Sequence, residues 1–170
     1  MQTVLTTLFY HHDLRLVALA AVICALSAFA GVTLLEHAGR VGAGRMRTIW
    51  LAIAAGSVGF GVWATHFVAM LSFAMGMPTG YDLWMTLLSL GLAVVVTGAG
   101  FWVATIGDHR SDKALGGAIV GLGIAGMHYV GMRALLVGGQ IVWDATLVSS
   151  SLLLGMVFGA AISRSACASR

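Results

Sequence analysis

The chain alternates long apolar segments with short polar ones. Five apolar segments occupy residues 14–35, 48–73, 83–106, 114–137 and 145–162. A helix needs about 20 residues to cross the hydrocarbon core of a bilayer, and backbone polar groups in lipid must be satisfied within the spanning structure. Because the segments lack the strict alternation of barrel strands, they predict an all-α membrane protein, a bundle of about five transmembrane helices.

Polar residues recur within this apolar pattern at a fixed spacing. His66, in GFGVWATHFVAM, and His128, in GLGIAGMHYVGM, lie 62 positions apart. Asp82 and Asp144 have the same spacing, and Asp13 precedes the first apolar segment in the same way. Each aspartate comes directly before a predicted helix, where an N-cap side chain would accept hydrogen bonds from the first amides. A part in the functional site is the alternative interpretation of these aspartates.

The spacing predicts a chain built from repeated helical hairpins. Repeat 1 covers about residues 12–72 and repeat 2 about residues 81–136. A third repeat, about residues 143–170, contains only its first helix and is incomplete. We therefore expect a single transmembrane domain over residues 1–170, and the faces left exposed by the missing sixth helix favour a homodimer.

The composition excludes an ordinary soluble domain, because 59% of the residues are hydrophobic and only 9% are charged. Seven of the nine Lys and Arg residues fall on one side of the predicted bundle: Arg40, Arg45, Arg47, Arg110, Lys113, Arg164 and Arg170. The positive-inside rule makes that side cytoplasmic, with the N-terminus outside and the C-terminus cytoplasmic. Nucleic acid is not an expected partner, since these cations lie in short connections and the tail. The first apolar segment lacks a small-residue cleavage site, so we expect a retained helix rather than a signal peptide.

The two histidines are the main candidates for a functional site. Ionisable side chains inside a membrane are costly and usually functional. Each has a glycine seven residues before it and a methionine four residues after it, Met70 or Met132, and these spacings share one helix face. Because glycine marks the face where another helix approaches closely, His66 and His128 are expected to point into the bundle, in the outer part of the membrane.

Imidazole and thioether donors together favour copper, especially Cu(I). The candidate ligands are His66, His128, Met70, Met132, Met127 and His12. The alternative is structural: the histidines would be satisfied by hydrogen bonds and the methionines would fill the apolar core.

The two histidine segments resemble the motif of the MHYT family, bacterial integral membrane sensor domains named for Met-His-Tyr-Thr. Met127, His128 and Tyr129 fill the first three places of the motif, and His66 fills its histidine in the first copy. The departures are Val130 for Thr in the second copy, and Thr65 and Phe67 for Met and Tyr in the first. The resemblance covers nearly the whole chain. The family usually has three copies, so a site that needs a third histidine would be incomplete unless a partner subunit supplies it.

The resemblance implies a signalling sensor of the bacterial inner membrane. It implies copper near the outer face, a response to O2, CO, NO or redox state, and a cytoplasmic output partner of the kind that makes or hydrolyses cyclic di-GMP. No catalytic activity is expected from this chain by itself. Two other classes stay open: electron transfer, with His66 and His128 as axial ligands of a haem, and transport of copper or another solute.

Overall fold

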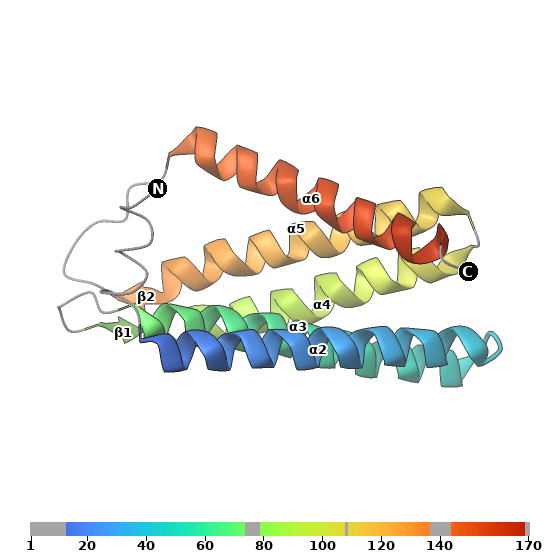
Figure 1. Cartoon of the computed structure of the whole chain (residues 1–170), viewed down its shortest axis with the longest axis horizontal. Helices are drawn as coiled ribbons and strands as arrows, with labels where there is room; N and C mark the ends of the chain where they lie inside the picture. The colour runs from blue at the N-terminus through green and yellow to red at the C-terminus, as the bar shows by residue number, and fades with distance from the viewer. Residues whose placement is uncertain (1–12, 74–78, 108, 137–143, 169–170) are drawn as a thin grey trace.

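The computed structural model describes residues 13–73, 79–107, 109–136 and 144–168, with side chains up to residue 161. In this part of the chain it contains five helices: α2 (Leu14–Arg40), α3 (Arg45–Ser72), α4 (Leu83–Ile106), α5 (Arg110–Ala134) and α6 (Ala145–Ala168). They form an elongated bundle in which each helix packs on the next along the chain (Figure 1). The all-helical prediction is therefore confirmed.

The bundle has the size and surface of a membrane domain. Helices α2, α3, α4 and α5 are each long and apolar enough to cross a bilayer, and the apolar part of α6 with described side chains is the shorter segment Ala145–Ala161. Large apolar side chains cover the outside, with Phe29 71% exposed and Trp84 79% exposed. An apolar surface of this extent suits contact with lipid rather than with water.

Several helix ends predicted from hydropathy were wrong. Helix α2 continues beyond residue 35 to Arg40, α3 begins at Arg45 rather than 48, and α5 begins at Arg110 rather than 114. Hydropathy marks only the part of a helix that lies in hydrocarbon, whereas arginine is a good helix former and extends the helix into the polar region. Helix α6 likewise runs on beyond 162, and α5 ends at Ala134 rather than at 137.

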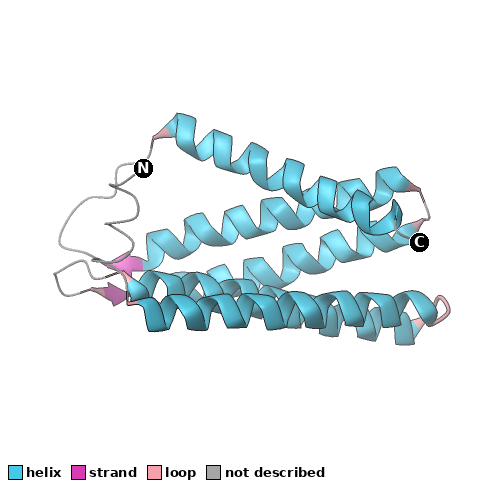
Figure 2. Ribbon diagram, viewed as in Figure 1, coloured by secondary structure: helices cyan, strands magenta, loops and turns pink. Residues whose placement is uncertain are grey.

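A short strand pair at one end of the bundle was not predicted. Strand β1 (Gly80–Tyr81) lies antiparallel to β2 (Leu135–Leu136), as Figure 2 shows. Segments of two residues carry no periodicity that a sequence could reveal. We call this end of the bundle the strand end. The opposite end, with the 41–44 and 107–109 connections, is the basic end.

The three repeated aspartates all serve as N-caps. Asp13, Asp82 and Asp144 open α2, α4 and α6, and the side chain of each accepts a hydrogen bond from a backbone amide in the first turn. The donors are Arg15 at 2.9 Å, Met85 at 2.8 Å and Thr146 at 2.7 Å. Hydrogen bonds from the backbone amides of Leu147 and Thr146 also hold the pKa of Asp144 below its usual range. The capping interpretation thus accounts for these three side chains.

The backbone of the first two caps ties each hairpin together at the strand end. The amide of Asp13 donates to the carbonyl of Ser72 at 2.8 Å, and the amide of Asp82 donates to the carbonyl of Ala134, also at 2.8 Å. Ser72 and Ala134 are themselves 62 residues apart. The sequence repeat is therefore a repeat of hydrogen bonding: the start of each hairpin is bonded to the end of its second helix.

Helices α5 and α6 touch through glycines near the basic end. A Cβ added to Gly121 would lie 2.1 Å from the carbonyl oxygen of Gly155, and one added to Gly159 would lie 2.2 Å from that of Gly117. From this close approach α6 diverges from α5 toward the strand end (Figure 1). The divergence leaves the half of α5 near the strand end, which carries His128, less covered by α6 than the half near the basic end.

Candidate functional site

His66 on α3 and His128 on α5 lie against each other near the strand end. Their Nδ1 atoms are 3.3 Å apart. The ring centroids are 4.9 Å apart, with an interplanar angle of 78°. Each histidine lies six residues before the end of its helix, His66 before Ser72 and His128 before Ala134. The repeat therefore places both imidazoles at the same level of two neighbouring helices.

Gly131 permits the contact between α3 and α5. A Cβ at this position would lie 2.7 Å from Nε2 of His66 and 3.0 Å from its Cδ2. The imidazole of His66 is thus packed on the bare backbone of α5, one turn after His128. Nε2 of His66 is buried and has no hydrogen-bond partner among the described residues. Gly131 was missed as a site residue, although it stands three positions after the histidine in GMHYVGM.

The paired Nδ1 atoms can do one of two things. With one nitrogen protonated and the other not, they share a hydrogen bond whose direction depends on the tautomers. Alternatively, both can present lone pairs to one metal ion. Two ligands at roughly 2.0 Å from a metal lie at most about 4 Å apart, so the observed 3.3 Å fits two ligands of one ion. Nε2 of His66 faces Gly131, which leaves the Nδ1 side as the place for an ion.

The predicted thioether ligands occupy different environments. Met70 and Met132 are half-buried, one turn beyond the two histidines. Met127 is only 1% exposed, so its side chain is part of the packed interior. His12 lies outside the described residues. Across the described part of the chain, no three His, Cys, Asp or Glu side chains are grouped so that they could hold a metal. In a metal site at the histidine pair, any further ligand from the described residues would therefore have to be of another kind, such as a methionine thioether.

Aromatic rings connect the pair with the strand end and with α6. The ring of Phe67 lies 5.1 Å from His66 and 5.4 Å from Tyr81 in β1, between centroids. Burial raises the pKa of the Tyr81 phenol. On the other side, the ring of Tyr129 lies 5.2 Å from His128.

Tyr129 links the histidine pair to the last helix. Its hydroxyl is hydrogen-bonded to the hydroxyl of Ser151 on α6. This contact bridges the two helices on the side where α6 diverges from α5. Ser151 was missed by the sequence analysis, because a serine in an apolar helix usually bonds its own preceding turn, as Ser151 also does with Val148.

A buried polar contact between α3 and α4 was missed as well. The indole Nε1 of Trp63 donates to the Ser89 hydroxyl at 3.1 Å, and Ser89 is fully buried. Trp63 lies three residues before His66 and also packs on Phe67, with centroids 4.9 Å apart. The face of α3 that carries the histidine is therefore fixed to α4 by a hydrogen bond.

Comparison with known proteins decides the family. The family described as the MHYT bacterial signalling protein N-terminal repeat matches residues 59–117 and 121–168, more than half of the chain. The chain belongs to the MHYT family. The two matched segments begin at Gly59 and Gly121, which have the same spacing as His66 and His128. No solved structure matches the chain.

Three longer MHYT relatives show where such chains occur. The chain is 41% identical over 152 residues to an uncharacterized signaling protein of Caulobacter vibrioides, which covers 89% of the chain and 19% of the relative. It is 41% identical over 145 residues to the bifunctional diguanylate cyclase/cyclic di-GMP phosphodiesterase MucR of Pseudomonas aeruginosa. This match covers 84% of the chain and 21% of the relative. It is 37% identical over 143 residues to the cyclic di-GMP phosphodiesterase NbdA of the same organism. This match covers 83% of the chain and 18% of the relative. The chain thus spans about a fifth of the length of these signalling proteins.

Proposed function

We propose that this MHYT chain is the sensory part of a bacterial membrane signalling system, with one copper ion held between His66 and His128. The ion would respond to O2, CO, NO or redox state. The observation that carries the proposal is the 3.3 Å separation of the two Nδ1 atoms, on helices whose sequences repeat. Two of the relatives are enzymes that make or hydrolyse cyclic di-GMP, so the output partner we propose acts on cyclic di-GMP.

The proposed topology places the chain in the inner membrane with the strand end outside. Arg40, Arg45, Arg47, Arg110 and Lys113 gather at the basic end, which the positive-inside rule assigns to the cytoplasm. The histidine pair then lies toward the outer face, where a gas or a periplasmic copper ion arrives first. The end of α6 lies on the cytoplasmic side, where an output partner would receive the signal.

The chain contributes the ligands and their geometry to the proposed site. His66 and His128 would hold the ion through Nδ1, and Met70, Met132 and Met127 stay the predicted thioether ligands, with His12 outside the described residues. Copper with such a soft donor set supplies a coordination position for a diatomic ligand and a one-electron redox change. Gly131 holds the His66 ring in place, and Phe67 shields it from the strand end. In a homodimer, the partner subunit would supply a further ligand.

Transmission requires two packings of the helices that the liganded and unliganded sites stabilise differently. The contact between α3 and α5 is short and centred on His66 and Gly131. A change at the pair would therefore shift these two helices relative to each other. The hydrogen bond from Tyr129 to Ser151 would carry the shift to α6, which diverges from α5 in this half of the bundle.

The geometry favours a single ion over the alternatives. A haem with two axial histidines needs the porphyrin between the rings, whereas the two Nδ1 atoms here are 3.3 Å apart, within hydrogen-bonding reach. Copper transport would need donors that continue through the membrane. Between the histidine pair and the basic end, the buried polar residues of the described helices are Ser89 and Thr97, and neither is a soft copper ligand.

Metal analysis of the chain, purified without a histidine tag, tests the proposal. We expect copper in the wild type and its loss in the double variant His66→Ala/His128→Ala. His109→Ala is the matched control, because His109 is exposed at the basic end. A double variant that keeps wild-type copper would refute the site. A Soret band in the wild type would instead support the haem alternative.

A further inference from the structure

A groove between α3 and α4 at the basic end is separate from the histidine pair. It has a volume of about 340 Å³ and is lined by residues of the 41–44 connection and the facing ends of the two helices. Its apolar wall consists of Leu51, Trp102 and Ile106. Trp102 is 51% exposed and Ile106 is 67% exposed, so the groove opens to the surface of the bundle that lipid covers.

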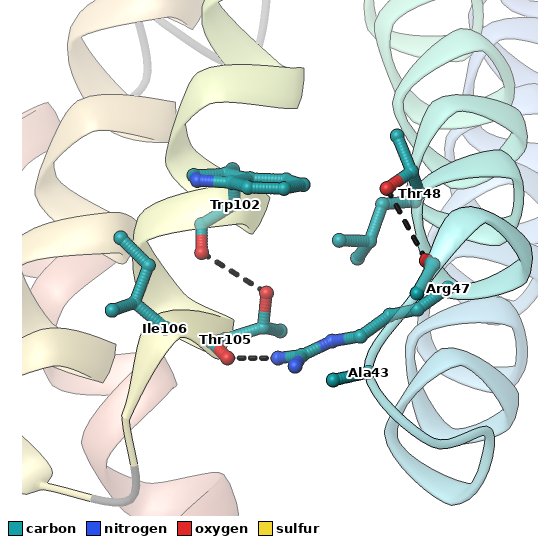
Figure 3. A pocket seen from close by; sticks show the side chains of 8 residues that line it. Ala43, Arg47, Thr48, Trp102, Thr105 and Ile106 are labelled. Atoms are coloured by element: carbon teal, nitrogen blue, oxygen red, sulfur yellow. Dashed lines mark hydrogen bonds between the residues drawn. The ribbon is translucent and has the colours of Figure 1, made fainter.

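Arg47 crosses the mouth of this groove. Its side chain extends from α3 to α4, where a guanidinium NH2 group donates to the carbonyl of Thr105, as Figure 3 shows. This bond satisfies one of the free carbonyls at the C-terminal end of α4. The Nε–H of Arg47 is buried and has no hydrogen-bond partner among the described residues. This buried donor of a cation is unsatisfied, so the guanidinium as a whole lacks an acceptor beyond the Thr105 carbonyl in the described part of the chain.

Among the described residues, no carboxylate forms an ion pair with Arg47. The residues that line the groove include no aspartate or glutamate. The two ion pairs found in the described part of the chain are Arg40 with Glu36 and His109 with Asp112. Because a partly buried guanidinium is stabilised by an anionic acceptor, the groove is built for a group that carries negative oxygen atoms.

The position of the groove along the bundle indicates which molecule would supply the negatively charged oxygen atoms. Arg47 is the third residue of α3 and Thr105 the second-last of α4, so both lie where apolar helix gives way to polar connection. Phosphate groups of lipids lie at this level of a bilayer, and tryptophan is enriched there. Trp102 and Ile106, which lie on either side of Thr105 in the sequence of α4, are apolar and exposed, as contact with an acyl chain requires, whereas Leu51 is buried.

We propose that this groove binds an anionic phospholipid, with the phosphodiester on Arg47 and an acyl chain along Trp102 and Ile106. The ligand chemistry is a phosphate oxygen at the guanidinium, and the lipid is its source. Thr48 lines the same groove, and its hydroxyl donates to the carbonyl of Gly44 at 3.5 Å. The site does not depend on the metal proposed at the histidines.

Quenching of tryptophan fluorescence by brominated lipids tests this site. The full chain would be reconstituted in bilayers with phosphatidylglycerol or phosphatidylcholine carrying the same brominated acyl chains. Subtracting the signal of Trp102→Phe isolates the contribution of Trp102. Both lipids carry the phosphate, but only phosphatidylcholine neutralises it with its own choline cation. We therefore expect phosphatidylglycerol to quench Trp102 at a roughly fivefold lower mole fraction than phosphatidylcholine, the ratio expected for attraction of an anionic lipid to one basic side chain.

Arg47→Gln should abolish this preference, and Arg47→Lys, which keeps the charge, should retain part of it. Arg45→Gln is the matched control, because Arg45 is exposed at the same end and loses the same charge. An Arg47→Gln variant that keeps the preference would overturn the proposal, as would an equal loss in Arg45→Gln, which would indicate general surface charge only. Displacement of phosphatidylglycerol by millimolar inorganic phosphate would overturn the lipid source. A thermal melt of each variant verifies that it is folded.

Discussion

Replacing Gly131 with alanine is expected to separate the two histidines without removing either of them. The added Cβ would lie 2.7 Å from Nε2 of His66, about 0.7 Å short of the 3.4 Å at which ordinary contact begins. The ring must move by about this amount, or α5 must move away from α3. Either change can widen the 3.3 Å gap between the Nδ1 atoms to about 4 Å, the limit for two ligands of one ion.

The magnitude can be estimated for both affinity and stability. Substitutions that disturb the support of a metal ligand typically cost 10- to 100-fold in metal affinity, and we expect a loss in this range for copper. Overpacking costs about 1–3 kcal/mol, while alanine in place of glycine gains about 1 kcal/mol of helix propensity. The Gly131→Ala variant should therefore stay folded and bind copper weakly.

A Cu(I) titration against a competing chelator measures the affinity, and thermal unfolding in detergent measures the stability. Gly126→Ala is the matched control on the same helix, since its Cβ would meet only the flexible end of Leu92, at 3.2 Å from Cδ2. Wild-type copper affinity in a folded Gly131→Ala variant would refute the reasoning. So would an equal loss of affinity in Gly126→Ala.

Three further predictions concern the fold. The pKa of Asp144 lies below its usual range because first-turn amides donate to the carboxylate. Its capping contribution is therefore present above about pH 4 and is lost as the pH falls through the lowered pKa. Protection of the amides at the start of α6, measured relative to the intrinsic exchange rate at each pH, should fall on acidification in the wild type but not in Asp144→Asn. Ser89→Ala removes one of the two acceptors of the Trp63 indole and leaves the carbonyl of Thr86 at 3.3 Å. It should cost about 0.5–1 kcal/mol, so an unchanged melting temperature would contradict this role. Gly121→Ala should force α6 away from α5, because the new Cβ would lie 2.1 Å from the backbone of Gly155. Gly91→Ala is the control, because its Cβ would meet nothing within 4 Å. Only Gly121→Ala should lower the melting temperature.

Much of the fold could be predicted from the sequence because a membrane helix is defined by its apolar length. The repeat of His66 and His128, together with that of the capping aspartates, also predicted the hairpins and the N-caps that open them. The predicted helix ends at the basic end of the bundle were wrong. A helix continues beyond its apolar segment wherever the next residues favour helix, as α2 does to Arg40 and α5 does from Arg110. The strand pair depends on how two hairpins meet, which no local pattern encodes.

The site was predicted in its main residues but not in its geometry. An ionisable residue repeated inside apolar helices indicated His66 and His128. Helix periodicity directed both toward the interior, but only His66 is half-buried, whereas His128 is exposed. The contact between their Nδ1 atoms depends on the approach of α3 to α5, which Gly131 permits. The bond from Tyr129 to Ser151 depends in turn on where α6 crosses α5. Such contacts follow from tertiary packing and not from spacing along the chain.

X-ray absorption spectroscopy of the copper-loaded chain tests most directly whether the two histidines share one ion. The account predicts one copper per chain with scattering from two imidazole rings, and one ring per copper in the His128→Ala variant. Copper without imidazole scattering would contradict it. Two coppers per chain, each with a single ring, would contradict the shared site in the same way.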